Sequence, residues 1–274
     1  MRKSFDFITG ATGFVGSALV LELLSRTERT LVCLVRAEDS FAAYERLQST
    51  LHEAALAYGC EQLIPEIFSR CVAVAGDLQD PGFGANLNHL GTPGDFWHCA
   101  ASLEFDESRT REIFQNNLHG TRNALDVARS LGAERFLHVS TAYVCGQRLG
   151  NIPEEAPNPE TGFHNPYEAS KAQTELMLLQ EREMDVRIIR PSIVIGNSRN
   201  FACTGPARTA SVVLPNGTPA ITFGTLRTAR SISATLIAAR VKSAWRAFGK
   251  IVNDRSLIAP NTPVTAPAMP APRI

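Results

Sequence analysis

The chain has 274 residues, of which 44% are hydrophobic and 20% charged, and its 27 basic and 27 acidic side chains leave a formal net charge of zero. A chain of this length buries a sizeable core in one or two domains, and we expect a cytoplasmic protein without a nucleic-acid partner. Arg187 and Arg190 interrupt the apolar run at 186–195, and no other run reaches the roughly 18 residues that a membrane helix needs. No transmembrane span is predicted.

The first residues and the cysteines agree with that location. An apolar run begins within five residues of Met1 and leaves no room for a signal peptide, so none is expected. The six cysteines lie at least eleven residues apart and lack the CxxC spacing of zinc and redox sites. We therefore predict no metal site, and free thiols in a reducing compartment.

Charge and proline content divide the chain near residue 200. Residues 1–200 carry 18 basic and 26 acidic side chains, whereas residues 201–274 carry 9 and 1. The second part also holds 8 of the 16 prolines and is rich in Ala, Thr and Ser. Such a composition is typical of a disordered or extended tail.

Apolar, strand-like runs alternate with amphipathic helical stretches through the first part of the chain. Strands are predicted at about 4–9, 30–35, 71–75, 94–99, 135–140 and 186–190. Helices are predicted at about 14–26, 40–57, 109–131 and 166–183. This alternation indicates βαβ units, and right-handed crossovers then give an α/β fold with a doubly wound parallel sheet.

The first strand and the first helix are joined by TGATGFVG, which contains three glycines at a spacing of three. Glycine lets the chain turn sharply and brings backbone amides close to a pyrophosphate at the start of a helix. The alternative is a glycine turn with a structural role alone, but its place at the first β–α junction favours a dinucleotide. The expected contacts are Gly10, Thr12, Gly13, Phe14, Val15 and Gly16.

The second strand ends in LVRAED, where the adenosine ribose of a dinucleotide would lie. Arg36 can hold the 2′-phosphate of NADP with two hydrogen bonds, which favours NADPH. Glu38 and Asp39 leave open a NAD ribose as the alternative. Arg46 is either a second phosphate contact or an exposed helical arginine.

A third cofactor contact is predicted after the third strand, in the sequence GDL. Asp77 there can accept a hydrogen bond from the adenine amino group, with Leu78 beside it. The alternative is an aspartate that serves only the turn.

The helix that begins after Asn165 carries the predicted acid–base pair. Asn165 is a good N-cap, Pro166 suits the first helical position, and Glu168 can reach back to the cap amide. Tyr167 and Lys171 then lie on one face, four residues apart, where the ammonium is expected to lower the phenol pKa toward neutrality. The alternative is a partly buried tyrosine beside a surface lysine.

Small and polar residues follow the fourth and fifth strands, at the sheet edge where such folds bind ligands. Ser140 and Thr141 in HVSTAYVCG can donate hydrogen bonds to a developing oxyanion. Ala100 and Ala101 in HCAASLEF leave room for the cofactor backbone, and Asn117 in NNLHGT is expected to hold a water or a backbone carbonyl beside the lysine.

In this order, TGATGFVG, GDL, HCAA, NNLHGT, HVSTAYVCG, YEASK and RPSIVIG resemble the extended short-chain dehydrogenase/reductases, which have the Rossmann fold. RPSIVIG and RAEDSFAAYERL make the sequence most similar to the branch of fatty acyl-CoA reductases and terminal thioester reductase domains. The resemblance implies a catalytic triad of Thr141, Tyr167 and Lys171. It also implies that Pro191, Ser192 and Ile193 line the nicotinamide.

The resemblance covers about residues 4–204, so we assign 1–204 to the NAD(P)-binding domain and 205–274 to an atypical basic tail that replaces a substrate-binding subdomain. The implied activity is NADPH-dependent reduction of an acyl thioester, on coenzyme A or a carrier protein, to an aldehyde. The alternatives are a sugar epimerase or dehydratase, a 3β-hydroxysteroid dehydrogenase-like oxidoreductase, and a cofactor-binding remnant without activity.

In the tail, 228–252 has the spacing of a basic amphipathic helix, which suits a peripheral membrane contact or an acidic partner; the alternative is a weakly ordered appendage.

Overall fold

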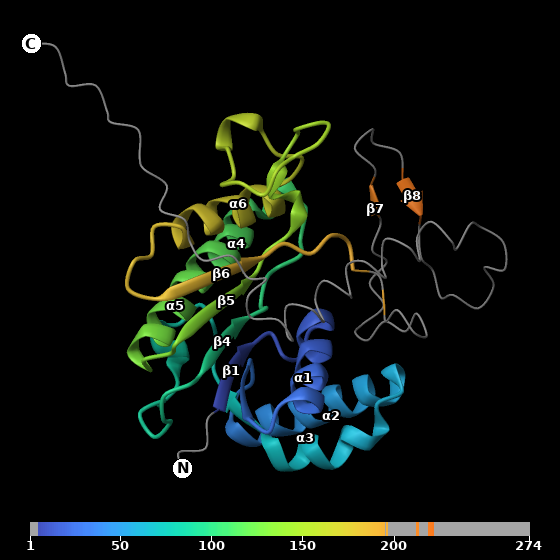
Figure 1. Cartoon of the computed structure of the whole chain (residues 1–274), viewed down its shortest axis with the longest axis vertical. Helices are drawn as coiled ribbons and strands as arrows, with labels where there is room; N and C mark the ends of the chain where they lie inside the picture. Colours follow the sequence, from blue (N-terminus) through green and yellow to red (C-terminus); the bar gives the residue numbers. More distant parts are fainter. Residues whose placement is uncertain (1–4, 195, 197–211, 214–218, 222–274) are drawn as a thin grey trace, which may run out of the picture.

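A six-stranded parallel sheet forms the centre of the molecule (Figure 1). The computed structural model describes residues 5–194, 196, 212–213 and 219–221, so the predicted helix at 228–252 lies outside the described residues. The strand order β3-β2-β1-β4-β5-β6 is that of a doubly wound fold, as the sequence predicts. The strands are β1 (Phe5–Thr9), β2 (Thr30–Val35), β3 (Cys71–Ala75), β4 (Asp95–His98), β5 (Arg135–Val139) and β6 (Asp185–Ile189). A separate antiparallel pair joins β7 (Val212–Val213) to β8 (Pro219–Ile221).

Successive residues of each strand point to opposite faces of the sheet and so enter two separate cores. Ile8 of β1 belongs to one core and Phe7 to the other, and Leu137 and Phe136 of β5 divide in the same way. The first core is covered by α1 (Phe14–Arg26), α2 (Ser40–Tyr58) and α3 (Ile64–Arg70). The second is covered by α5 (Gly120–Ser130) and α6 (Pro166–Leu178). Because helices cover both faces of the sheet, polar side chains that take part in a reaction are expected at the ends of the strands.

Two predicted helices differ from the structure. The stretch predicted at 109–131 is divided into α4 (Thr110–Phe114), a π-helical turn at Gln115–His119, and α5. The helix predicted to reach 183 ends at Leu178. The Glu181 carboxylate is buried, where it accepts a hydrogen bond from Arg129 of α5. It also accepts from the backbone amides of Arg182 and Glu183. The helix stops because these two amides are bonded to the Glu181 side chain and not to helix carbonyls. Helix α3 was not predicted.

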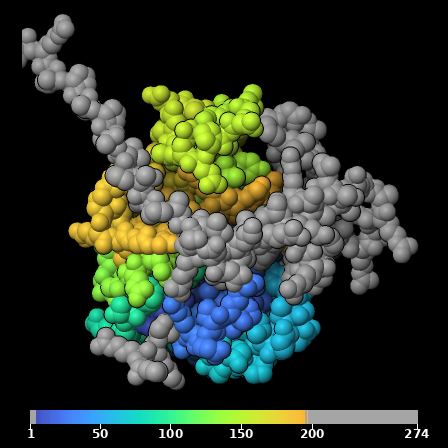
Figure 2. All heavy atoms as spheres, viewed as in Figure 1, coloured from blue at the N-terminus to red at the C-terminus, as the bar shows by residue number. Residues whose placement is uncertain are grey.

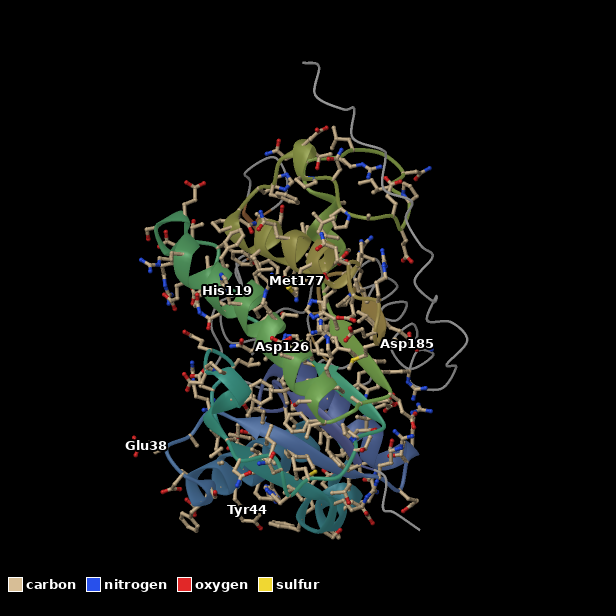
Figure 3. All side chains as sticks on the ribbon, turned by 90° about the vertical axis from the view of Figure 1, so that its left-hand side faces the viewer. Glu38, Tyr44, His119, Asp126, Met177 and Asp185 are labelled. Atoms are coloured by element: carbon tan, nitrogen blue, oxygen red, sulfur yellow. The ribbon has the colours of Figure 1, made fainter. Side chains whose placement is uncertain are left out.

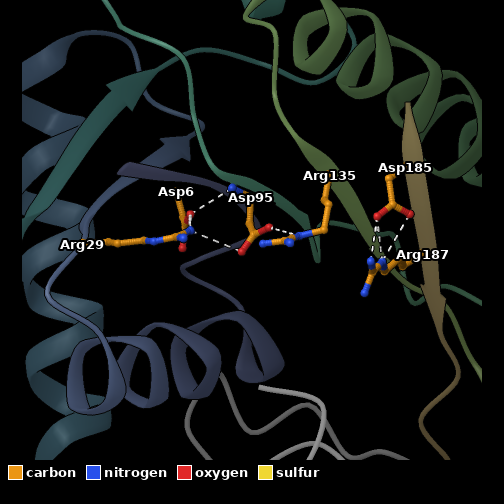
Figure 4. Close-up of polar contacts among 6 residues, drawn as sticks. All are labelled: Asp6, Arg29, Asp95, Arg135, Asp185 and Arg187. Atoms are coloured by element: carbon orange, nitrogen blue, oxygen red, sulfur yellow. Dashed lines mark hydrogen bonds and ion pairs between the residues drawn. The ribbon is translucent and has the colours of Figure 1, made fainter. Parts of the chain in front are cut away.

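The amino-terminal edge of the sheet carries a line of ion pairs (Figure 4). The carboxylates of Asp6 in β1 and Asp95 in β4 are buried there and are bridged by Arg29, at 2.5 and 3.3 Å. Asp95 also accepts from Nε of Arg135 at 2.5 Å, at the start of β5. These contacts tie β1, β4 and β5 together at the edge opposite the predicted site.

Candidate active site

Two glycines of the turn between β1 and α1 stand where a side chain has no room. Gly10 has a φ of +76°, and a Cβ there would lie 2.6 Å from the backbone nitrogen of Ala100. A Cβ on Gly16 would overlap the carbonyl oxygen of Gly10. Gly13 caps α1 and is exposed, and the first turn of α1 holds no acidic residue. The turn therefore fits a pyrophosphate, whose charge the helix terminus favours.

Of three further residues predicted around this turn, two open α1 and one lies within the turn. Phe14 and Val15 open α1 and pack partly buried against the first core. Thr12 is half-buried in the turn itself. The side chains of Phe14 and Val15 are thus directed by packing, and a phosphate at this turn would meet its backbone.

Two arginines meet beyond the end of β2. Arg36 is exposed, and Nη1 of Arg46 donates to its carbonyl oxygen at 2.7 Å. Asp39 is engaged otherwise, because its carboxylate caps α2 by accepting from the amide of Ala42 at 2.8 Å. Glu38 is exposed, and Figure 3 shows its side chain pointing away from the ribbon. Arg36 and Arg46, the two predicted contacts of a 2′-phosphate, thus lie next to each other. Of the two acidic residues, Asp39 is used as the N-cap of α2.

The residues after β3 and β4 complete the strip along which a dinucleotide would lie. One carboxylate oxygen of Asp77 accepts from the amide of Gln79 at 2.9 Å, so Asp77 serves the turn. The carbonyl of Leu78 accepts from the side chain of Asn123 at 2.8 Å. Ala100 lies against Gly10, and Ala101 is exposed beside it.

Helix α6 begins where the sequence predicts. The side chain of Asn165 accepts from the amide of Glu168 at 3.0 Å, with Pro166 in the first position. The Glu168 carboxylate accepts from the amide of His164, one residue before the cap, at 3.0 Å. This cap sets the phase of the helix and directs Tyr167 and Lys171 toward the carboxyl edge of the sheet.

Tyr167 and Thr141 come together at that edge. Thr141 is buried two residues after the end of β5, and its side chain lies close enough to the phenol of Tyr167 to influence the pKa of that group. Burial raises the pKa of Tyr167 to about 12, and the contact with Thr141 opposes this rise. The ring of Phe105 meets the Tyr167 ring edge to face, with centroids 5.5 Å apart. The phenol is therefore a protonated donor at neutral pH.

Lys171 is fully buried and does not act on the phenol as predicted. Its Nζ donates to the carbonyl oxygen of Val139 at 2.8 Å and to Nε2 of His138 at 3.0 Å. Burial lowers the pKa of Lys171 to about 8, although Glu175 opposes the shift. The predicted lowering of the Tyr167 pKa is wrong for this structure, because the ammonium is held by β5 and burial dominates the phenol.

Asn117 lies buried in the π-helical turn, and its side chain connects the loop after β4 to α6. Its Oδ1 accepts from the amide of Ser102 at 2.7 Å, and its Nδ2 donates to the Ser102 carbonyl and to Oγ of Ser170, at 3.1 and 2.9 Å. The predicted backbone carbonyl is thus that of Ser102. Asn117 positions the loop next to Lys171 rather than offering a free group to the cofactor.

Two buried histidines behind the site were not predicted. His98 and His138 are paired in the register of β4 and β5, and their rings stack with centroids 5.3 Å apart. His98 lies between the hydroxyls of Thr9 and Thr121, at 2.7 and 2.9 Å. The signal that could have found them is a histidine at the same place in two adjacent strand ends, in HCAA and HVST.

The last predicted group follows β6. The carbonyl of Pro191 accepts from the amide of Ala142 at 2.9 Å, which holds this segment beside Thr141. Ser192 and Ile193 are exposed. Ile193 shares this edge of the sheet with three other exposed apolar side chains from the loops after β4 and β5, namely Leu103, Phe105 and Tyr143. In Figure 2 the yellow-green segment between β5 and α6 projects at the same end of the molecule.

Within the described ranges, no helix combines the length and the apolar character needed to cross a membrane. Among the same residues, no three His, Cys, Asp or Glu side chains gather in a way that could hold a metal ion.

The strand order, the glycine turn and the match to a family model indicate an oxidoreductase of the extended short-chain dehydrogenase/reductase type, with a Rossmann-like domain for a nicotinamide cofactor. The NAD_binding_4 family model, described as male sterility protein, matches residues 8–221, and the chain belongs to this family.

Two curated relatives and one solved structure each match more than half of the chain. Probable fatty acyl-CoA reductase 5 of Arabidopsis thaliana is 34% identical over 169 residues, which are 57% of this chain and 34% of that protein. Fatty acyl-CoA reductase 2 of Homo sapiens is 29% identical over 221 residues, 68% of this chain and 42% of that protein. The crystal structure of the terminal R domain from the myxalamid PKS-NRPS biosynthetic pathway matches with a TM-score of 0.64 and 27% identity, over 73% of this chain and 51% of that one. The chain thus spans about a third to two fifths of these two curated reductases.

Proposed function

We propose that the chain reduces an acyl thioester, carried by coenzyme A or a carrier protein, to an aldehyde with NADPH. The observation that carries the proposal is the pairing of Thr141 with a protonated Tyr167 beside the buried Lys171, at the edge where the glycine turn lies. The similarity to fatty acyl-CoA reductases and to a terminal reductase domain supports a thioester as the substrate.

The side chains of this chain supply what a thioester carbonyl needs during reduction. When bound, the reduced nicotinamide supplies a hydride to the carbonyl carbon. The hydroxyls of Thr141 and Tyr167 donate hydrogen bonds to the oxygen as it gains negative charge, and Tyr167 has the proton to give. The carbon–sulfur bond then breaks, the thiol leaves with the proton, and an aldehyde remains. Lys171 orients the cofactor ribose and keeps a positive charge near the reacting oxygen.

The exposed apolar side chains at this edge suit an acyl group. Leu103 is 68% exposed and Phe105 55%, although both lie on the loop that Asn117 holds against α6. Large apolar side chains exposed beside a polar site favour a ligand with an apolar portion. They give the acyl chain a surface on which to lie while its carbonyl meets Thr141.

Incubation of the full chain with NADPH and a series of acyl-coenzyme A esters tests the proposal. We expect one thiol and one aldehyde for each NADPH oxidised, because reduction with cleavage of the carbon–sulfur bond yields both products. Thiol release without NADPH oxidation would indicate hydrolysis. Oxidation of NADPH on a sugar nucleotide or a sterol, with no action on any thioester, would replace the proposed function by one of its alternatives.

The two arginines beyond β2 support NADPH over NADH. We expect Arg36→Ala to weaken NADPH binding by about 10- to 100-fold, because a hydrogen bond to a charged group contributes roughly 1.5–3 kcal/mol. NADH binding should change little, because NADH has no 2′-phosphate for Arg36 to contact. Fluorescence titration of both cofactors measures this, with Arg122→Ala, an exposed arginine of α5, as the control. Equal affinities in the unaltered chain would contradict the assignment.

A further inference from the structure

His138 is a wholly buried histidine of β5 that contacts the proposed catalytic lysine. Its Nε2 lies 3.0 Å from Nζ of Lys171, and one face of its ring stacks on His98 of β4. An ammonium has only donors, so Nε2 must accept and the ring must carry its proton on Nδ1. Burial holds the pKa of His138 well below its usual value, and the charge of Lys171 adds to this, so the ring is neutral.

Among the residues that the structure describes, the other ring nitrogen of His138, Nδ1, has no hydrogen-bond partner. A buried polar atom left in this way costs about 1–3 kcal/mol, which an apolar side chain of similar size would avoid. His98 differs, because both of its ring nitrogens are engaged, by Thr9 and Thr121. The polar contribution of His138 is therefore directed at Lys171 alone.

Lys171 has three N–H groups, and β5 engages two of them. One points to the carbonyl of Val139 and one to His138, which leaves the third for a group outside this pair. We propose that His138 is a positioning residue. By accepting a hydrogen bond from Lys171, it keeps the lysine charged and fixes the orientation of the ammonium, so that the third N–H points to the cofactor. This inference rests on the proposed function for the role of Lys171, and it adds the residue that controls it.

Other groups near Lys171 act through charge. On α6, the charge of Glu175 raises the pKa of Lys171 and so favours its charged form. The Glu175 carboxylate itself is fully buried and paired with Arg190. From β4 come His98, whose pKa burial lowers to about 3, and Cys99, whose pKa burial raises to about 12. Neither carries charge at neutral pH. Among the described residues, His138 and the Val139 carbonyl are thus the acceptors that Lys171 meets on the sheet.

Nuclear magnetic resonance of the full ¹⁵N-labelled chain tests this without substrate. Long-range ¹H–¹⁵N spectra of the imidazoles identify the tautomer of His138, for which we expect the proton on Nδ1. A pH titration of the Lys171 Nζ signal then compares three variants with the unaltered chain. In His138→Leu the pKa of Lys171 should fall by about one unit or more, because a hydrogen bond to a charged group is lost. His138→Gln, which keeps an acceptor oxygen, should restore most of this shift.

The third variant is a control for the loss of a histidine elsewhere. His119 is exposed and labelled in Figure 3, and His119→Leu should leave the Lys171 titration unchanged. Binding of NADPH near pH 7.5 should weaken by about threefold or more in His138→Leu and recover in His138→Gln, following the charged fraction of the lysine.

Two results would overturn the inference: a proton on Nε2 of His138, or a Lys171 titration that is the same in His138→Leu. The tautomer spectrum of the unaltered chain decides the question even where the leucine variant does not fold. The reductase proposal fails separately, through absent thioester turnover in the unaltered chain.

Discussion

Tyr167→Phe is expected to lower kcat/KM for thioester reduction by about 10²- to 10⁴-fold, because it removes the proton donor of the site. The same substitution leaves the oxyanion with one hydroxyl donor, that of Thr141, in place of two. NADPH binding should stay within about threefold of the parent, since the hydrogen bonds of Lys171 go to β5 and not to the phenol. Stopped-flow measurement of NADPH oxidation, together with a fluorescence titration, separates the two effects.

Tyr44→Phe is the matched control, because Tyr44 is an exposed residue of α2 on the far side of the first core (Figure 3). It should keep the parental rate and the parental affinity. Parental turnover in Tyr167→Phe would show that another group protonates the product, and the proposed site would be wrong. A variant that loses NADPH binding as well would show that the ring itself shapes the cofactor site.

The strands and the glycine turn could be predicted because their signals are local. An apolar run between polar residues predicts both ends of β2 and of β3. A Cβ on Gly10 or Gly16 is excluded by atoms within the glycine turn or directly beside it. The start of α6 was equally clear, since one cap residue sets the phase. Helix α3 was missed because its seven residues include a proline and are too few to show a helical period.

The electrostatics of the site could not be predicted from spacing. A separation of four residues places Tyr167 and Lys171 on one face of a helix, but it does not say to which neighbour the ammonium donates. That depends on His138 and on the Val139 carbonyl, which the strand register brings to α6. The raised pKa of Tyr167 and the stacked histidines are likewise products of burial between elements far apart in the sequence.

Asp95→Asn is expected to lower the free energy of unfolding by about 3 kcal/mol, the second large effect that the structure predicts. The Asp95 carboxylate is buried, receives Nε of Arg135 at 2.5 Å and lies 3.3 Å from the guanidinium of Arg29 (Figure 4). An amide of the same shape cannot balance these charges, so Arg135 stays partly buried beside a neutral group. Urea denaturation followed by circular dichroism measures the change.

The affected edge is opposite the cofactor site, so NADPH affinity measured well below the melting temperature should stay within about twofold of the parent. Asp126→Asn is the control, because Asp126 forms an ion pair with Arg129 while its side chain is 59% exposed, and such pairs contribute about 0–1 kcal/mol. In an Arg135→Met background the loss from Asp95→Asn should shrink, since the cation that needed the carboxylate is gone. If Asp95→Asn costs no more than Asp126→Asn, the line of ion pairs does not hold the strands together, and the stability of the sheet rests on its two apolar cores alone.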